Sequence, residues 1–306
     1  MTRLLAFLGR QGRFLLVAGL LAGIALPSLA AAMRPWLPEL VAALMFVAAL
    51  RIGPRQALGA VRDLPSVVGV VLAYQLALPL IVAALFWSVG LAGSPVATAL
   101  ILMSAASPIS GSPNLAVLSG GDPAPALRLL IVATALLPVT VLPVFFLAEG
   151  LGGPSAVVAA AARLLGVILL ATTAAFLVRG RLIRNPQPRT IAALDGLSAL
   201  AMAIVVIGLM SAAGPTLLSR PLAFFGWLAI AMAANLGLQV LAGIVLGRSP
   251  LAAQRIPLAI SAGNRNIALF LVALPPEVTA PILIFIGCYQ VPMYLTPLLM
   301  RRVYAR

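Results

Sequence analysis

Long apolar runs recur along the whole chain, and short segments rich in arginine, glycine and proline separate them. A helix needs about 20 apolar residues to cross the ~30 Å hydrocarbon core of a membrane, whereas spanning strands would alternate polar and apolar residues over about ten positions. The pattern therefore predicts an all-α polytopic membrane protein. The ten predicted spans are residues 14–33, 36–51, 64–89, 94–120, 125–148, 155–178, 190–211, 221–246, 251–273 and 277–299. A cleaved signal peptide is the alternative for the first run, because arginines precede it and alanines 30–32 close it.

Polar residues interrupt the apolar pattern of two spans. In span 94–120, Pro108 and Pro113 each remove a backbone donor, and we expect the helix to break over residues 107–113. In span 251–273 the run SAGNRN contains no proline, so a break there depends on Gly263 and on the polar residues Ser261, Asn264, Arg265 and Asn266. Non-helical backbone inside a membrane needs cover from protein or a watery cavity, and its freed groups bind ions and polar solutes. For span 94–120 the alternative is a proline kink in a continuous helix, with serine side chains that bond the backbone of their own helix.

The two interrupted stretches resemble each other. SGSPNLAVL (residues 110–118) and AGNRNIALF (residues 262–270) both read as a small residue, glycine, a polar residue, any residue, asparagine and an apolar run. Asn114 and Asn266 align, 152 positions apart, and each lies in the fourth span of its half. Five spans per half require opposite orientations of the two halves, so the pattern predicts inverted repeats at 1–152 and 153–306.

Composition and charge support the membrane class and exclude others. The chain is 63% hydrophobic and 8% charged, with a mean hydropathy of +1.16, which no ordinary soluble domain shows. The net charge of +14 comes from twenty arginines. With the N-terminus in the cytoplasm, sixteen lie in inside segments and two, Arg34 and Arg220, outside. This positive-inside bias predicts a multi-pass inner-membrane protein in a lipid bilayer, with both termini cytoplasmic and no nucleic-acid partner.

Few residues are available for catalysis or metal binding. The chain has no histidine, no lysine and one cysteine, so neither a disulfide framework nor a His/Cys metal site is expected. All six carboxylates can be placed at or near helix ends. No nucleotide-binding G-x-x-x-x-G-K-[ST] loop appears, which argues against ATP-driven transport within this chain. We expect no enzyme and no cofactor.

Arg265 is the most informative candidate residue. An arginine at mid-membrane costs roughly 2.5–3.5 kcal/mol and needs a partner. No carboxylate is expected nearby, so the predicted partners are backbone carbonyls of the first break, a bound anion, or both; a structural arginine held by carbonyls alone is the alternative. The candidate substrate- or ion-binding residues are Gln75, Ser110, Gly111, Ser112, Asn114, Ser261, Gly263, Asn264, Arg265 and Asn266. Asn235, Gln239, Tyr289 and Gln290 are expected to be interhelical hydrogen-bonding residues.

On these features the chain resembles the bile acid:sodium symporter family. The shared features are ten spans in two halves, a fourth span broken by Gly, Pro and Ser before Asn, a Gly121-Asp122 turn, and an Asn motif in span 9. Arsenite exporters and auxin-carrier-like proteins share this plan. The resemblance implies a panel domain (spans 1, 2, 6 and 7) and a core domain (spans 3–5 and 8–10). Broken spans 4 and 9 would cross in the core, beside a site for an organic anion.

The sodium ligands of that family are only partly present. Its span 9 pattern Glu-x-Gly-x-Gln-Asn reads Ser261-Ala262-Gly263-Asn264-Arg265-Asn266 here, and its Ser-Asn pair in span 4 reads Pro113-Asn114. Thr134 is the hydroxyl residue closest to the expected span 5 ligands, and Gln75 could match the glutamine of span 3. Loss of the glutamate and gain of a fixed cation both disfavour sodium. Na⁺ coupling is therefore expected to be weakened or absent.

The predicted function is secondary active transport of a small organic anion by alternating access. Within transport, a sodium-independent efflux carrier, a uniporter or an arsenite-exporter-like protein are alternatives. Outside transport, a ligand sensor or scaffold on a transporter fold is the alternative. An intramembrane enzyme is disfavoured, because only serines remain as nucleophiles.

Overall fold

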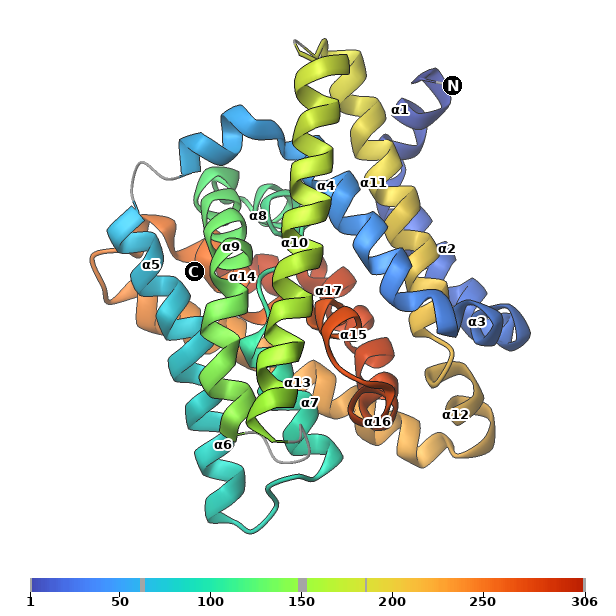
Figure 1. Cartoon of the computed structure of the whole chain (residues 1–306), viewed down its shortest axis with the longest axis vertical. Coiled ribbons are helices and arrows are strands. Elements are labelled where there is room, and N and C mark those ends of the chain that lie inside the picture. The colour runs from blue at the N-terminus through green and yellow to red at the C-terminus, as the bar shows by residue number, and fades with distance from the viewer. Residues whose placement is uncertain (1, 61–63, 148–152, 185, 305–306) are drawn as a thin grey trace.

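The computed structural model describes residues 2–60, 64–147, 153–184 and 186–304, and these residues form helices joined by short turns (Figure 1). Within them, seven helices are long and apolar enough to cross a membrane. They are Pro27–Gly59, Leu64–Ser88, Pro123–Leu147, Pro154–Leu182, Pro188–Leu209, Pro221–Gly247 and Pro276–Tyr304. The chain is therefore an all-α, multi-pass membrane protein, as predicted.

Six of the seven are built from the labelled elements as follows. Leu64–Ser88 joins α5 (Leu64–Leu72), the π-helical turn η3 (Ala73–Ala77) and α6 (Leu78–Ser88), while Pro276–Tyr304 joins α16 (Pro276–Thr279), η6 (Ala280–Ile282) and α17 (Leu283–Tyr304). The other four are single helices: α9 (Pro123–Leu147), α10 (Pro154–Leu182), α11 (Pro188–Leu209) and α13 (Pro221–Gly247).

The N-terminal boundary prediction is wrong. No helix spans 14–33: α1 (Thr2–Arg10) and α2 (Gly12–Ala25) end before Leu26, and α3 (Pro27–Met33) begins at a proline. Proline is tolerated in the first turn of a helix but not inside one, so Pro27 starts a new helix. Through η1 (Arg34–Trp36), α3 continues into α4 (Leu37–Gly59) to give the 33-residue stretch Pro27–Gly59.

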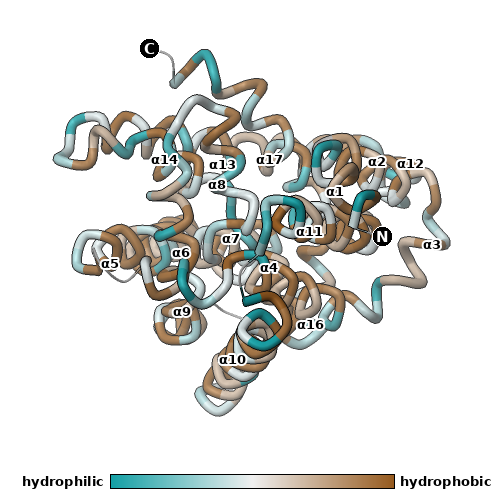
Figure 2. Tube along the Cα trace, turned by 90° about the horizontal axis from the view of Figure 1, so that it is seen from above, coloured by the Kyte–Doolittle hydropathy of each residue, from teal (hydrophilic) through white to brown (hydrophobic). Residues whose placement is uncertain are grey.

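Close backbone approach holds the N-terminal helices against α11. A Cβ atom on Gly196 of α11 would lie 1.7 Å from the carbonyl oxygen of Leu5, so only glycine fits there. Gly19 of α2 likewise faces the backbone of Ala203. Small residues are the usual means of close packing between helices in a membrane. In both views α1 to α3 lie at one side of the molecule and α5 and α6 at the other (Figures 1 and 2).

Hydrophobic side chains also cover the outside of the molecule. Trp87, Leu170 and Leu222 are each more than 70% exposed. Figure 2 shows hydrophobic residues along nearly every helix, including the outermost ones. This is expected of helices that face lipid, where apolar side chains need no burial by protein. By contrast, α9 and α17 contribute many of the residues of the buried core.

Spans 94–120 and 251–273 are each made of short helices. The first consists of α7 (Pro95–Ala105) and α8 (Ser112–Leu118). The second consists of α14 (Arg255–Gly263), η5 (Ile267–Leu269) and α15 (Phe270–Ala273). The total of ten spans and the inverted repeats stay predictions. The predicted repeat boundary adjoins residues 148–152, which lie outside the described residues, as do Arg62 and Arg306 of the predicted inside segments.

Candidate functional site

The two helix breaks meet inside the protein. Pro108, between α7 and α8, and Arg265, after α14, form an isolated antiparallel β-bridge. The backbone N–H of Ile109 donates to the carbonyl oxygen of Asn264 at 3.0 Å, and the N–H of Asn266 donates to that of Ser107 at 2.8 Å. Each break thus supplies hydrogen-bond partners that the other needs, which is the condition for non-helical backbone at membrane depth. We call this pair of segments, residues 106–111 and 264–266, the paired breaks.

The first break follows from its prolines. Helix α7 ends at Ala105 because Ala106 is extended (φ −64°, ψ 154°) and Ser107 precedes Pro108, a position that disfavours helix. The predicted break over 107–113 was too long at its end, since α8 begins at Ser112. Pro113 lies in the first turn of α8, where a missing donor has no cost.

The second break has no proline, and it lies where the backbone approaches α13 closely. A Cβ atom on Gly263 would lie 2.2 Å from the carbonyl oxygen of Asn235, so only glycine fits. The freed carbonyl of Gly263 accepts hydrogen bonds from Asn235 Nδ2 at 2.6 Å and from the hydroxyl of Tyr289. The side chain of Asn264 donates back to Ile260 O at 2.9 Å and ends the helix. That the break depends on Gly263 stays a prediction.

Arg265 joins the two breaks. Its side chain is 1% exposed, with Nε donating to Ala262 O at 2.8 Å and Nη1 donating to Ala106 O at 2.9 Å. The guanidinium carbon lies 4.9 Å from the centroid of the Tyr74 ring, a cation–π contact. Among the described residues Nη2 has no hydrogen-bond partner. The carbonyl partner predicted at the first break is Ala106 O.

A buried polar chain supports the second break from behind. Tyr304 OH donates to Gln239 Oε1 at 3.0 Å, and Gln239 Nε2 donates to Asn235 Oδ1 at 2.7 Å and to Thr296 Oγ1 at 3.1 Å. Thr296 Oγ1 lies 3.2 Å from Asn264 Oδ1 and completes the connection. The interhelical roles predicted for Asn235, Gln239 and Tyr289 are confirmed. The prediction for Gln290 is wrong, because its side chain bonds Ile286 O and Tyr294 of its own helix. The role of Thr296 was missed because a single hydroxyl in an apolar helix carries no pattern, and that of Tyr304 because it follows Arg301 and Arg302 beyond the predicted span 277–299.

The structure places the other candidates of the two breaks as follows. Ser261 bonds its own helix through Pro257 O at 2.8 Å, and Ser112 is buried with no hydroxyl partner among the described residues. Ser110, Gly111 and Asn266 are half-buried. None of these side chains therefore has a shown contact to the Arg265 guanidinium.

Gln75 lies buried in the π-helical turn η3, next to Tyr74. Its Oε1 accepts from Thr140 Oγ1 of α9 at 3.4 Å, while its Nε2 has no partner among the described residues. Thr140, rather than Thr134, is therefore the hydroxyl residue of this helix that contacts a candidate side chain. Single π-helical turns inside α-helices are frequent at functional sites.

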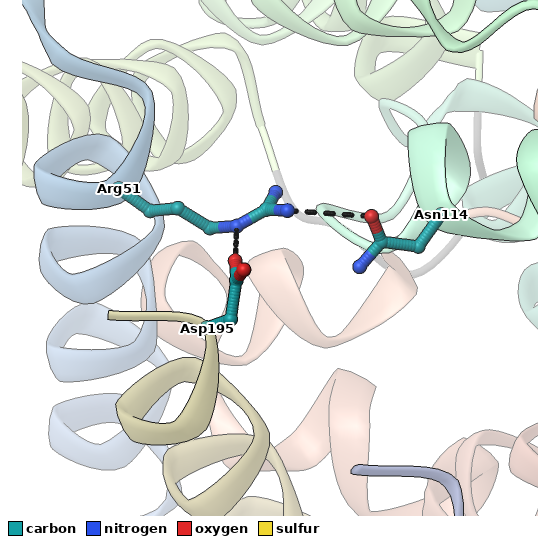
Figure 3. Close-up of polar contacts among 3 residues, drawn as sticks. All are labelled: Arg51, Asn114 and Asp195. Atoms are coloured by element: carbon teal, nitrogen blue, oxygen red, sulfur yellow. Dashed lines mark hydrogen bonds and ion pairs between the residues drawn. The ribbon is translucent and has the colours of Figure 1, made fainter. Parts of the chain in front are cut away.

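Asn114 faces a different set of residues, drawn in Figure 3. It is exposed, and its Oδ1 accepts a hydrogen bond from Arg51 Nη2 of α4 at 3.3 Å. Arg51 Nε forms an ion pair with Asp195 of α11. Sequence reasoning treated Arg51 as a topology signal and Asp195 as a helix-end residue, and missed both. A usable signal existed: Asp195 is the one acidic residue between Glu149 and Glu277.

The described residues hold no group of three or more histidine, cysteine, aspartate or glutamate side chains that could bind a metal. Among the described residues lie cavities of about 330 and 290 Å³; Arg255 lines both, and the smaller one reaches Gln239 and Tyr304. No protein-family model and no curated protein matches this sequence. The site is therefore interpreted from its geometry.

Proposed function

We propose that this protein is a secondary transporter that carries a small organic anion across the membrane by alternating access. The observation that carries the proposal is the pair of helix breaks, which meet inside an all-helical membrane protein with a buried arginine between them. Discontinuous helices of this kind form the substrate sites of many transporters, near the middle of the bilayer. The proposal includes ten spans in two inverted repeats.

The cost of the paired breaks favours a functional role. Two interrupted helices expose backbone groups that continuous helices would satisfy internally. The protein meets this cost with the β-bridge, with the Arg265 guanidinium and with the polar chain from Tyr304 to Asn264. A purely structural membrane protein gains nothing from this arrangement, whereas a transporter gains polar groups at the depth where its substrate binds.

Helix packing supports a division into core and panel. Helix α4 packs on both α10 and α11, and α11 also packs on α2, which gives one group of helices. Helix α13 packs on α14 and α17, while α8 packs on α9 and α14, which gives a second group that contains both breaks. The two groups meet where α9 packs on α10 and where α15 packs on α4 and α10. In the proposed cycle the first group is the panel, the second is the core, and they rock about the substrate.

Sodium independence is part of the proposal. The Arg265 guanidinium occupies the carbonyls of Ala106 and Ala262, oxygens of the kind that a hard cation would need. A sodium ion in the same place would also meet a fixed positive charge in a poorly screened interior. Arg265 thus acts as a permanent internal cation that holds the two breaks together without ion binding.

Flux measurements test the proposal. The full chain, reconstituted in proteoliposomes, should exchange organic anions at a rate that a sodium gradient does not change. Strongly sodium-driven uptake would contradict the role of Arg265 but not transport itself. Absence of flux for every anion tried, in either direction, would contradict the transporter and favour a ligand sensor on the same fold, if ligand binding persists.

A further inference from the structure

Arg51, Asp195 and Asn114 bring together the two groups of helices. Arg51 and Asp195 belong to α4 and α11 of the proposed panel, whereas Asn114 lies on α8 of the proposed core, directly after the first break (Figure 3). The side chains of Arg51 and Asp195 are 24% and 33% exposed, so protein does not cover them completely. A contact between panel and core that is open to solute is where a transported substrate would bind.

The guanidinium of Arg51 is only partly committed. Nε is held by Asp195, while Nη2 donates to Asn114 at 3.3 Å, which is longer than the roughly 2.7–2.9 Å of a strong charge-assisted bond. Figure 3 shows that Nη1 makes no contact with the other residues drawn. The Nη1–Nη2 edge is the geometry that binds a carboxylate through two parallel hydrogen bonds.

We infer that Arg51 is the anchor for a carboxylate group of the substrate, an inference that rests on the proposed function. The carboxylate takes the Nη1–Nη2 edge and displaces Asn114 Oδ1, while Asp195 keeps Nε and fixes the orientation of the guanidinium. The freed amide of Asn114 retains N–H donors that can bond the same carboxylate. The ligand carboxylate then bonds Arg51 of the panel and Asn114 of the core, in place of the weak direct hydrogen bond between these two residues.

Gly53 keeps Arg51 in place for this role. Helix α4 kinks two residues after Arg51, at Gly53 (φ 73°) followed by Pro54. A Cβ atom on Gly53 would lie 3.0 Å from Nε of Arg179, so the kink also packs tightly against α10. Helix α4, which carries Arg51, packs on α10 and α11 of the panel and also on α15 of the core, whereas Asn114 is carried by α8. Movement of α8 relative to α4 would therefore change the distance between Arg51 and Asn114.

Ligand binding to the purified full chain tests the inference. The probes are aliphatic and aromatic monocarboxylates of two to ten carbons, each paired with its neutral carboxamide, and the readouts are thermal stabilisation and calorimetric Kd. Wild type should bind at least one carboxylate and not its amide. Arg51→Gln should weaken that binding by about ten- to hundredfold, because a charge-assisted bidentate contact is lost. Arg51→Lys should also weaken it, since lysine lacks the planar fork.

Matched variants separate an anchor from a structural ion pair. Arg55→Gln removes an exposed arginine of the same helix and should leave the Kd unchanged. Asp195→Asn should tighten carboxylate binding, because it removes a like charge beside the bound carboxylate while its amide oxygen can still accept from Nε. Equal Kd values for Arg51→Gln and Arg55→Gln would overturn the inference, as would the lack of any preference for a carboxylate over its amide. Anion flux that persists unchanged in Arg51→Gln would overturn the anchor while leaving the transporter in place.

Discussion

Arg265 and Arg51 both contact the region of the helix breaks, yet their surroundings differ in kind. Arg265 is 1% exposed and bonds two main-chain carbonyls, which cannot leave. Arg51 is 24% exposed and bonds a carboxylate and an amide, both at the ends of side chains that can turn away. Arg265 therefore keeps its hydrogen-bond partners, whereas Arg51 can exchange its partners.

The difference shows how burial decides what an arginine does. A buried cation whose partners are backbone groups is costly to disturb, because removal leaves its partners unsatisfied. A half-exposed ion pair contributes little to stability and exchanges partners readily. We therefore propose that Arg265 holds the site together and that Arg51 contacts the ligand. The variants below test these two roles through the free energy of unfolding.

The largest expected effect comes from Gly263, the residue that lets the second break approach α13. Gly263→Ala places a methyl group 2.2 Å from Asn235 O, a backbone atom that cannot move away without displacing α13. We expect a loss of at least about 3 kcal/mol in the free energy of unfolding, at the upper end for overpacking. Thermal unfolding in detergent measures it. Gly237→Ala on the same helix pair, with nothing within 4 Å, is the control and should lose nothing.

The next effect comes from Arg265 itself. Arg265→Met leaves the carbonyls of Ala106 and Ala262 without a donor, which should cost about 2–4 kcal/mol of unfolding free energy. The variant must be compared with Arg51→Met, which should cost much less. A similar loss of unfolding free energy in the two variants would contradict the view that Arg265 is fixed while Arg51 exchanges partners.

A double variant tests whether Arg265 stands in for an ion. Ser261→Glu with Arg265→Gln restores the glutamate and glutamine of the resembled family, and thus the negative charge and hard oxygens that sodium needs. We expect sodium chloride, but not choline chloride, to raise the melting temperature of this variant and to leave wild type unchanged. A rise in the melting temperature of wild type that is specific to sodium would contradict the proposal that Arg265 takes the place of a sodium ion.

The sequence was sufficient for much of this architecture and not for the contacts of Arg51. Repeated apolar runs predicted the membrane class. Pro108 and Pro113 predicted the first interruption, and the polar run around Gly263 predicted the second, because local backbone chemistry decides where a helix can continue. The boundary at Pro27 was missed because the apolar pattern continues across it. The Arg51–Asp195 pair joins residues 144 positions apart, and nothing local to either residue indicates its partner.

The smallest expected stability effect belongs to that pair. Because both side chains are partly exposed, a double-mutant cycle of Arg51→Gln and Asp195→Asn should give a coupling of less than about 1 kcal/mol in unfolding free energy. The coupling should shrink further when salt is raised from about 0.05 M to about 0.5 M, because salt screens exposed charges. The Debye length is about 10 Å near 0.1 M salt, which lies between these two concentrations. A coupling of several kcal/mol that resists salt would mean that the pair is a fixed part of the fold. In that case Arg51 would resemble Arg265, and its guanidinium would be too firmly held to exchange Asn114 for a ligand.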